Sequence, residues 1–409
     1  MNYRLLKTQF LITIFLTFIS TLFIFEIPPR VISFYEKKIS NKNYKQRCFN
    51  IKLNEILFKY GSCPNNIYIK KRSKDYPIIE ETLSYTDSFG GRVEEKLTGK
   101  KFDKNKYNLY LIGDSFIQAD ELPYEKTVYG IINNSLNKKL LKAYGFGYSS
   151  WNTEQYLDSI KAINANNSLY DIFIFPNDYL PSYNKSRYGA LQKKSRVLKK
   201  NSHKNPFKYF LNKSVTFQKL KDAYLSQKST KITQKFWDKY TKEKNKCEFL
   251  DNNKNNISPR LVDYLYFSLP YSCWTEIHKE SYNLVLQDIK NMKKEANKRK
   301  SKIRFIYLPP GFSFIGENYP GKTHYYYGIP KNVEIKQTGL IQRLENDIGK
   351  SFIDLDAPIR MELSKKKQRQ FCLNENCNNL YYFGYDGHLN DKGHNFLYEY
   401  LYLNSNNIY

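Results

Sequence analysis

Ser115 stands where an α/β protein can place a nucleophile. The run 107–112 is short, apolar and aromatic, as in a buried strand, and it stops at Gly113. Ser115 follows, and 116–122 is expected to begin a helix. The hydroxyl would then lie at the carboxyl edge of a sheet, with its own N–H at a helix N-terminus that favours negative charge. An ordinary serine N-cap would look the same, so the serine alone does not establish catalysis.

A serine nucleophile needs a base, a group that orients the base, and donors for the oxyanion. Two of the five histidines lie in the run YDGHLNDKGH near the C-terminus. Asp386 and His388 are two residues apart, so in an extended loop both side chains point to one side and the carboxylate can orient the imidazole. We interpret Asp391 and His394 as first-turn residues of a final helix. A metal site using both histidines is the alternative, but no second acidic cluster supports it, and we expect neither a metal nor a cofactor.

Two further loop residues can donate to an oxyanion. Gly147 ends the predicted strand 143–147 and can present its backbone N–H with no side chain in the way. Asn177 follows the predicted strand 171–175 and can offer its side-chain amide. Both are common turn residues, and it is their placement after successive strands, in the same half as Ser115, that favours a functional role.

Strands alternate with helices in much of the chain. Beyond the strands above, we expect helices at 128–141, 152–163, 276–300 and 392–403 and strands at 303–308 and 351–355. This alternation predicts a mainly parallel sheet with helices on both faces, a three-layer α/β/α sandwich.

The remaining segments suggest a division of the chain into four parts. Residues 1–30 would be a membrane anchor and 31–105 a stem or small cap. The α/β domain would comprise 106–180 and 275–405. Between them, the segment 181–274 shows no strand–helix alternation and is interpreted as an insertion. It could be a cap over the active face or a partly ordered loop.

The N-terminus predicts a single-pass transmembrane helix. An uncharged stretch at 8–25 follows Arg4 and Lys7 and is near the lower length limit for spanning a bilayer. Pro28 and Pro29 end it. Because no small-x-small cleavage site precedes the prolines, we favour an uncleaved anchor over a cleaved signal peptide.

The basic residues and the cysteines predict different sides of the membrane for the part of the chain after the anchor. The basic residues after the span outnumber those before it, which by the positive-inside rule favours the cytoplasm. All six cysteines follow the anchor in three local pairs, an even count that favours disulfides in an oxidising compartment. They are Cys48, Cys63, Cys247, Cys273, Cys372 and Cys377. No C-x-x-C or finger spacing supports zinc. Since long domains translocate largely regardless of charge, we expect an extracytoplasmic, periplasmic body.

The sequence is strongly basic. It has 66 Lys and Arg against 39 Asp and Glu, a formal net charge of +27. Such an excess favours anionic partners, although a composition rich in Lys, Asn, Ile and Tyr also accounts for it. No nucleic-acid-binding motif is present, so we expect no nucleic acid as a partner.

The motifs above occur in the order of four blocks that are typical of the SGNH (GDSL-type) hydrolase superfamily. These blocks are Gly113-Asp114-Ser115-Phe116, Gly147, Asn177-Asp178 and Asp386-Gly387-His388. The resemblance covers about 107–180 and 275–405. It implies a flavodoxin-like sheet, Ser115 as nucleophile, His388 as base and Asp386 as its orienting group. It also implies an oxyanion hole from the N–H groups of Ser115 and Gly147 with the side chain of Asn177.

Two positions depart from the commoner pattern. Phe175 stands where the family has Gly, and Asp386 and His388 are two rather than three residues apart. That spacing resembles polysaccharide O-acetylation proteins related to the alginate O-acetyltransferases. The resemblance implies an esterase or O-acyltransferase that works through an acyl-serine intermediate. It would act on cell-envelope or secreted polysaccharide, with an acylated carbohydrate or other ester as substrate. The alternatives are a lipase or thioesterase, and a non-catalytic glycan-binding or scaffold protein on the same fold.

Overall fold

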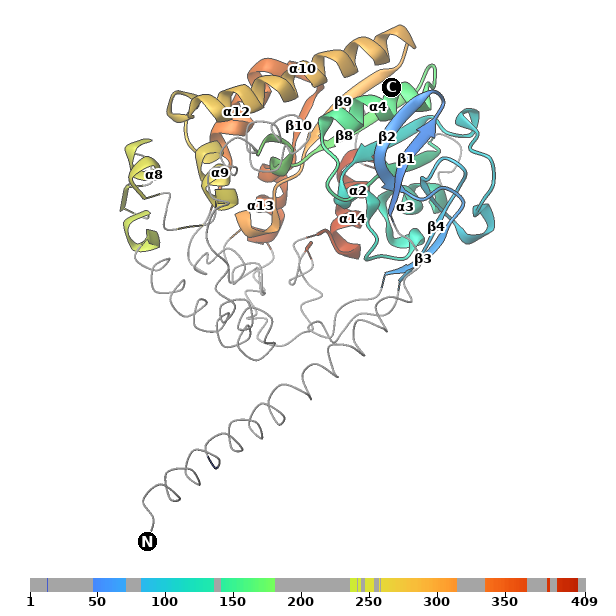
Figure 1. Ribbon diagram of the computed structural model, residues 1–409, viewed down its shortest axis with the longest axis horizontal. Helices are drawn as coiled ribbons and strands as arrows, with labels where there is room; N and C mark the ends of the chain where they lie inside the picture. Colours follow the sequence, from blue (N-terminus) through green and yellow to red (C-terminus); the bar gives the residue numbers. More distant parts are fainter. Residues whose placement is uncertain are drawn as a thin grey trace, which may run out of the picture. The chain divides into compact units, whose positions relative to one another are not determined.

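The computed structural model describes a large part of the chain (Figure 1). Described are residues 13, 47–70, 82–135, 141–180, 236–240, 242–243, 247–253, 257, 259–314, 335–365, 381–382 and 388–403. Apart from Thr13, they belong to one compact unit that comprises 44–190 and 233–409. The anchor predicted at 8–25 lies outside the described residues except for Thr13. Among the helices that are described, none combines the length and apolar character needed to cross a membrane.

An eight-stranded sheet runs through this unit in the order β10-β9-β8-β6-β7-β5-β4-β3. Its strands are β3 Ile67–Lys70, β4 Thr82–Thr86, β5 Arg92–Val93, β6 Leu109–Gly113, β7 Ala143–Gly147, β8 Leu169–Ile174, β9 Lys302–Tyr307 and β10 Phe352–Asp354. The strands from β6 to β10 pair in parallel. The strands from β3 to β5 extend the β7 edge by antiparallel pairing. The predicted α/β class with a mainly parallel sheet is therefore confirmed.

The direction in which successive parallel strands are added to the sheet reverses beside β6. Numbered along the chain from β6, they stand in the order 2-1-3-4-5. In such sheets the reversal leaves a crevice outside the carboxyl ends of the strands, where ligands bind. Ser115 follows β6, Gly147 ends β7 and Asn177 follows β8, so the predicted site residues gather at this reversal.

Helices cover both faces of the sheet (Figure 1). One face carries α4 Thr153–Ile163, α9 Pro259–Ser268, α10 Glu276–Lys298 and α12 Thr338–Ile348, and the other carries α3 Val128–Asn134, α13 Asp356–Lys365 and α14 Asp391–Tyr398. Successive residues of β6 point to opposite faces. Tyr110 and Ile112 join the first hydrophobic core, whereas Leu109 and Leu111 join the second. All four are fully buried, as expected for a strand covered on both sides.

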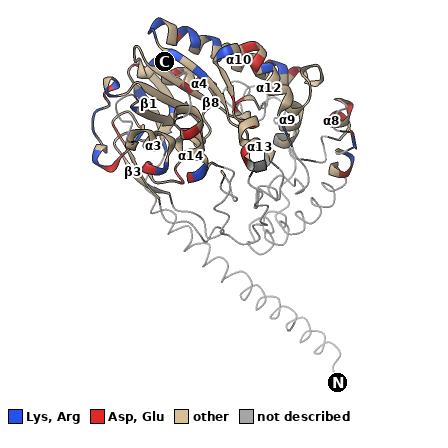
Figure 2. Cartoon of the chain, turned by 180° about the vertical axis from the view of Figure 1, so that it is seen from behind, with Lys and Arg blue, Asp and Glu red and all other residues tan. Residues whose placement is uncertain are grey.

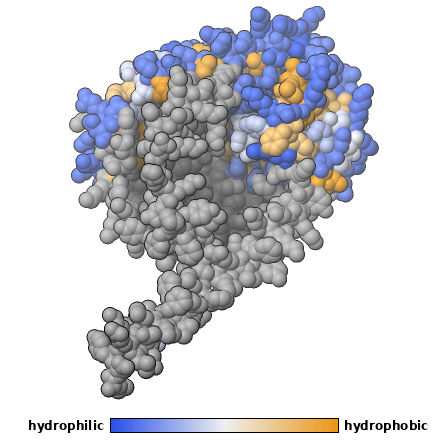
Figure 3. Space-filling model, viewed as in Figure 1, coloured by the Kyte–Doolittle hydropathy of each residue, from blue (hydrophilic) through white to orange (hydrophobic). Residues whose placement is uncertain are grey.

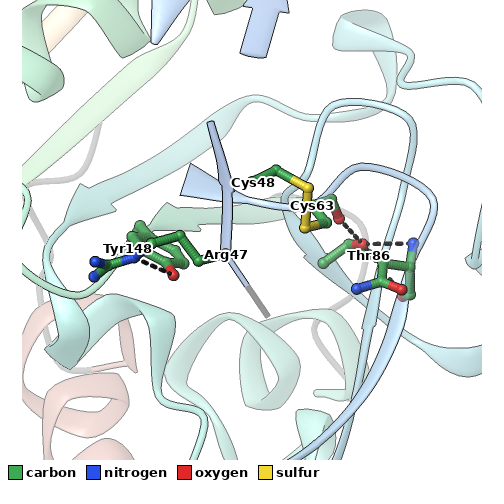
Figure 4. The surroundings of a disulfide bond; sticks show 6 residues. Arg47, Cys48, Cys63, Thr86 and Tyr148 are labelled. Carbon is green, nitrogen blue, oxygen red and sulfur yellow. Dashed lines mark hydrogen bonds between the residues drawn. A yellow bond between two sulfur atoms is a disulfide. The ribbon is translucent and has the colours of Figure 1, made fainter. Parts of the chain in front are cut away.

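A two-stranded hairpin, β1 Arg47–Leu53 with β2 Ile56–Ser62, packs beside α4. The ring of Phe58 stacks on Trp151 with centroids 5.4 Å apart. The Cys48–Cys63 disulfide closes the hairpin (Figure 4). A second disulfide joins Cys247, at the start of α8 Cys247–Asn253, to Cys273. Disulfides are thus confirmed for two of the three cysteine pairs, while Cys372 and Cys377 lie outside the described residues.

Several elements differ from the sequence-based expectation. The segment 31–105, predicted as a stem or small cap, contributes β1 to β5 in its described part, and three of these strands join the main sheet. The helix expected at 116–122 is only Ser115–Gln118 (α2), because Ala119 adopts a left-handed conformation with φ 47°. The helix expected at 128–141 ends at Asn134. The sequence pattern did not predict α12 and α13 at all.

Charges of both signs are interspersed on the described surface. Along α10, Lys and Arg stand among Asp and Glu (Figure 2). Two ion pairs on this helix, Lys279–Glu276 and Lys298–Glu295, have N–O distances of 2.9 and 2.7 Å. In the view of Figure 3 the described surface is mostly hydrophilic, with separate apolar spots. The positive charge of the sequence is therefore partly balanced locally on this helix.

Candidate active site

The structure brings Ser115 and His388 together. Nε2 of His388 lies 2.8 Å from Oγ of Ser115, although 273 positions separate the two residues. Ser115 is the first residue of α2, directly after the turn that follows β6, and His388 precedes α14. A hydroxyl that donates to an unprotonated ring nitrogen at this distance is arranged for removal of its proton.

Asp114 forms the turn before Ser115, and its carboxylate has two uses. The residue is 2% exposed. Oδ1 accepts a hydrogen bond from the backbone N–H of Phe116 at 3.0 Å and so caps α2. Oδ2 accepts from Nδ2 of Asn177 at 3.0 Å. Asn177 is therefore held beside the serine turn, by a residue to which sequence reasoning assigned no role of its own.

Gly147 lies against the same turn. It pairs with Gly113 between β7 and β6. A Cβ atom on Gly147 would stand 2.8 Å from the carbonyl oxygens of both Asp114 and Gly113. The two backbones approach too closely here for any side chain, which explains the glycine. Ser115, Gly147 and Asn177, the residues predicted for the oxyanion hole, thus surround one turn of the backbone.

A side-chain contact joins the loop after Gly147 to α2. The backbone N–H of Ser149 donates to Oε1 of Gln118 at 2.8 Å. Gln118 is the last residue of α2 and is 4% exposed. This contact connects the two backbone segments whose N–H groups are expected to bind an oxyanion, and no sequence motif signalled it.

Aromatic rings support His388 from one side. The ring of Phe116 lies 5.0 Å from that of His388, and Phe175 lies 4.3 Å from Phe116, measured between centroids. Phe175 occupies the position at which the resembled family has Gly. In this chain the larger side chain packs behind the ring that contacts His388, so the departure has a local structural explanation.

Asp178 supports the turn that carries Asn177. Its carboxylate accepts from the backbone N–H of Phe175 at 2.9 Å and from the Tyr156 hydroxyl at 3.1 Å. Burial, followed by the charge of Asp114, raises the pKa of Asp178 well above its usual value, although the hydrogen bonds from Phe175 and Tyr156 lower it. These contacts hold the turn that carries Asn177.

The second Asp–His pair has a different environment. Asp391 is exposed at the start of α14, where Asn390 is the N-cap. His394 is 1% exposed, and its Nδ1 accepts from the backbone N–H of Val128 at 3.2 Å. Burial and the positive charge of Arg92 lower the pKa of His394 to about 3, so its ring is neutral. Both residues lie in the first turn of the last helix, as interpreted from the sequence.

The predicted orienting carboxylate, Asp386, lies outside the described residues. Among the described residues, no group of three or more His, Cys, Asp or Glu side chains could hold a metal ion. No known family model matches the sequence, and no curated protein matches it.

Proposed function

We propose that this chain is a serine ester hydrolase or O-acyltransferase that works through an acyl-Ser115 intermediate. The observation that carries the proposal is the 2.8 Å contact between Nε2 of His388 and Oγ of Ser115 at the carboxyl edge of a parallel sheet. The positions of Gly147 and Asn177 beside the same turn support it, because each carries a donor that we assign to the oxyanion.

The proposed reaction has two halves. In the first, His388 takes the proton of Ser115 while Oγ attacks the ester carbonyl carbon. The N–H groups of Ser115 and Gly147 and the amide of Asn177 bind the oxyanion. When the tetrahedral intermediate collapses, the ester C–O bond breaks and His388 gives the proton to the leaving alkoxide. In the second half, His388 takes a proton from the acceptor, whose oxygen attacks the acyl carbon. As the bond between the acyl carbon and Oγ breaks, His388 gives this proton to Oγ and Ser115 is regenerated.

The nature of the acceptor separates the two activities. Water gives an esterase, and a sugar hydroxyl gives an O-acyltransferase. In both, Nε2 of His388 must be unprotonated at the start, so the ring proton is on Nδ1. We propose Asp386 as the carboxylate that accepts from Nδ1, as in other serine triads.

The fold and compartment form part of the same proposal. The 2-1-3-4-5 strand order and the helices on both faces support a three-layer, flavodoxin-like sandwich of the SGNH kind. Two disulfides among the described residues and the apolar stretch at 8–25 support a single-pass membrane protein with an extracytoplasmic catalytic domain. The proposed target is cell-envelope or secreted polysaccharide, which would be the acylated substrate of an esterase or the acceptor of an O-acyltransferase.

The catalytic assignment is tested with full-length protein and p-nitrophenyl acetate. Ser115→Ala and His388→Ala should each lower kcat by about 10³-fold or more, since members of such a triad act as a unit. His394→Asn is the matched control, because it alters a histidine of the same region that does not contact Ser115. Equal activity in all four proteins would exclude Ser115 and His388 as catalytic residues.

Esterase and transferase are then distinguished by product analysis. The wild-type protein is given p-nitrophenyl acetate with an oligosaccharide acceptor, and the sugar is examined by mass spectrometry. Acetylated oligosaccharide that is absent with Ser115→Ala identifies a transferase. Release of acetate alone identifies an esterase.

A further inference from the structure

A buried cation on β5 contacts the turn that follows the nucleophile's helix. Arg92 is 5% exposed. Its guanidinium donates to the backbone carbonyl oxygen of Gln118 at 3.2 Å, and also to those of Ala119 and Leu122. All three carbonyls lie at or just beyond the end of α2, which begins with Ser115.

This turn needs outside support. α2 is one turn long and ends because Ala119 has φ 47° and ψ 44°, a region that is strained for residues other than glycine. The last carbonyls of a helix also have no partners within the helix. A guanidinium suits this position, because its planar fork donates to several oxygens and its charge complements the helix C-terminus. Arg92 thereby stabilises the conformation in which α2 ends.

Neighbouring strands of the same segment hold the rest of the turn. The Tyr68 hydroxyl, on β3, donates to Oδ1 of Asp120 at 2.6 Å. The Thr82 hydroxyl, on β4, donates to the carbonyl oxygen of Glu121 at 3.4 Å. Asp120 is 3% exposed and interacts electrostatically with Arg92, which offsets part of the cost of burying both charges.

Movement of this turn would affect both the nucleophile Ser115 and the segment that carries Gly147. Ser115 lies three residues before Gln118, on the same helical turn. The side chain of Gln118 accepts from Ser149, two residues after Gly147. A displaced turn would therefore change the position of Ser115 relative to His388 and the position of Ser115 relative to Gly147.

We propose that Arg92 is a positioning residue for Ser115: by holding the end of α2, it sets the direction of the serine Oγ and N–H. The inference rests on the proposed function of Ser115. It assigns a role in catalysis to the segment before residue 106, which carries none of the SGNH-like motifs. Arg92 acts through the backbone of α2 and not on the substrate.

The competing explanation is that Arg92 contributes only to stability. Arg304 on β9 provides a matched comparison, because it is also a mostly buried arginine in the sheet. It binds Asp171 on β8 with two hydrogen bonds of 2.8 and 2.6 Å. Asp171 lies three residues before the end of β8, away from the turn that carries Asn177. Arg304→Lys should therefore weaken folding without changing the turn after Ser115.

The experiment compares full-length wild type, Arg92→Lys, Arg92→Met and Arg304→Lys. For each, the apparent kcat for p-nitrophenyl acetate and the initial rate of Ser115 labelling by a fluorophosphonate are divided by the folded fraction from near-UV circular dichroism. KM is compared directly. We expect kcat and the labelling rate to fall by about 100-fold in Arg92→Met, as for a small misplacement of reacting groups, with KM nearly unchanged. Arg92→Lys, which keeps the positive charge and one donor nitrogen, should recover part of the loss. Arg304→Lys should match wild type per folded molecule.

The outcomes separate this inference from the proposed function. Wild-type rates per folded molecule in Arg92→Met would overturn the positioning role, and so would an equal loss in Arg304→Lys. If Arg92→Met does not fold, the comparison of the two lysine variants decides. If wild-type Ser115 is not labelled at all, the proposed function itself fails.

Discussion

Nδ2 of Asn177 donates to Oδ2 of Asp114 across 3.0 Å, which joins the turn after β8 to the turn before α2. The other carboxylate oxygen of Asp114 accepts from the backbone N–H of Phe116. Both oxygens of a buried carboxylate are therefore used. A side-chain amide at position 114 has only one acceptor atom, so it cannot replace both contacts.

Asp114→Asn should lower kcat by about 10²-fold, because the new amide repels that of Asn177 and displaces an oxyanion donor. The unfolding free energy should fall by about 1–3 kcal/mol with the loss of a buried hydrogen bond. Esterase kinetics and urea unfolding measure the two effects.

The double variant Asp114→Asn/Asn177→Asp is the control for this prediction. It exchanges donor and acceptor, so the hydrogen bond can form again and part of the stability should return. Activity should not return, because a carboxylate at position 177 cannot donate to an oxyanion. Wild-type kcat in Asp114→Asn alone would contradict the role of the Asn177 contact.

Gly147→Ala should damage stability and activity together. The new Cβ would stand 2.8 Å from the carbonyl oxygens of Gly113 and Asp114, so the β7 end and the serine turn must separate. We expect a loss of about 1–3 kcal/mol, as for overpacking, measured by urea unfolding. A fall in kcat of about 10²-fold should accompany it, since the reacting groups are displaced.

Gly349→Ala is the matched glycine variant. Gly349 has φ 69° but no atom within 4 Å of a Cβ, so the substitution adds backbone strain alone. Its kcat should equal that of wild type. If both alanine variants lose kcat equally, close approach at Gly147 does not explain the effect.

The sequence predicted the strands that carry the site within about two residues. The reason is physical: β6 and β8 are buried along their whole length, so each is a nearly continuous apolar run that a turn residue ends. The pairing of Ser115 with His388 was also predicted, because the motifs occur in a known order. The structure adds Asp114, which uses both carboxylate oxygens in a way that the residue type alone does not reveal.

The strands β3 to β5 and the role of Arg92 could not be predicted in the same way. In β4 the inward positions are Thr82, Ser84 and Thr86, all buried, so the strand has no apolar alternation. Arg92 binds backbone carbonyls, and any residue type can supply those. Such contacts depend on the tertiary arrangement of the edge strands, and no spacing of residues in the sequence indicates them.

His394 should make folding pH-dependent. Its pKa is lowered to about 3 in the folded protein, mainly by burial, against about 6.5 when unfolded. Between these values the unfolded state binds more protons, so stability is fully present above about pH 6.5 and is lost as pH falls. From neutral pH to about pH 5, wild type should lose about 2 kcal/mol through this group, measured by urea unfolding.

His394→Asn isolates this contribution. The Asn side-chain oxygen can accept from Val128 but does not titrate, so the variant should show the smaller pH slope. Asp87, whose pKa burial raises to about 6, contributes a slope of opposite sign, but it does so in both proteins and cancels in the comparison. Identical slopes in the two proteins would show that His394 does not titrate as inferred.

The Cys48–Cys63 disulfide lies next to contacts that support the loop after Gly147 (Figure 4). Arg47 lies over the rings of Tyr60 and Tyr148, at 5.2 and 5.5 Å from their centroids, and its Nε donates to the Tyr148 hydroxyl at 3.2 Å. The Tyr60 hydroxyl donates to the carbonyl oxygen of Ser150 at 2.7 Å. The hairpin therefore holds the same loop whose Ser149 contacts α2.

Replacing Cys48 and Cys63 by Ser should cost about 3 kcal/mol, the value expected for a loop of this length, and should also lower kcat because the loop after Gly147 loses support. The Cys247→Ser/Cys273→Ser variant is the control. It removes a disulfide of comparable span, with sequence separation 26, that joins α8 to the segment before α10. Its stability should fall similarly, whereas kcat per folded molecule should stay at the wild-type value. Wild-type kcat per folded molecule in both cysteine-to-serine double variants would show that the hairpin stabilises the fold without influencing the site.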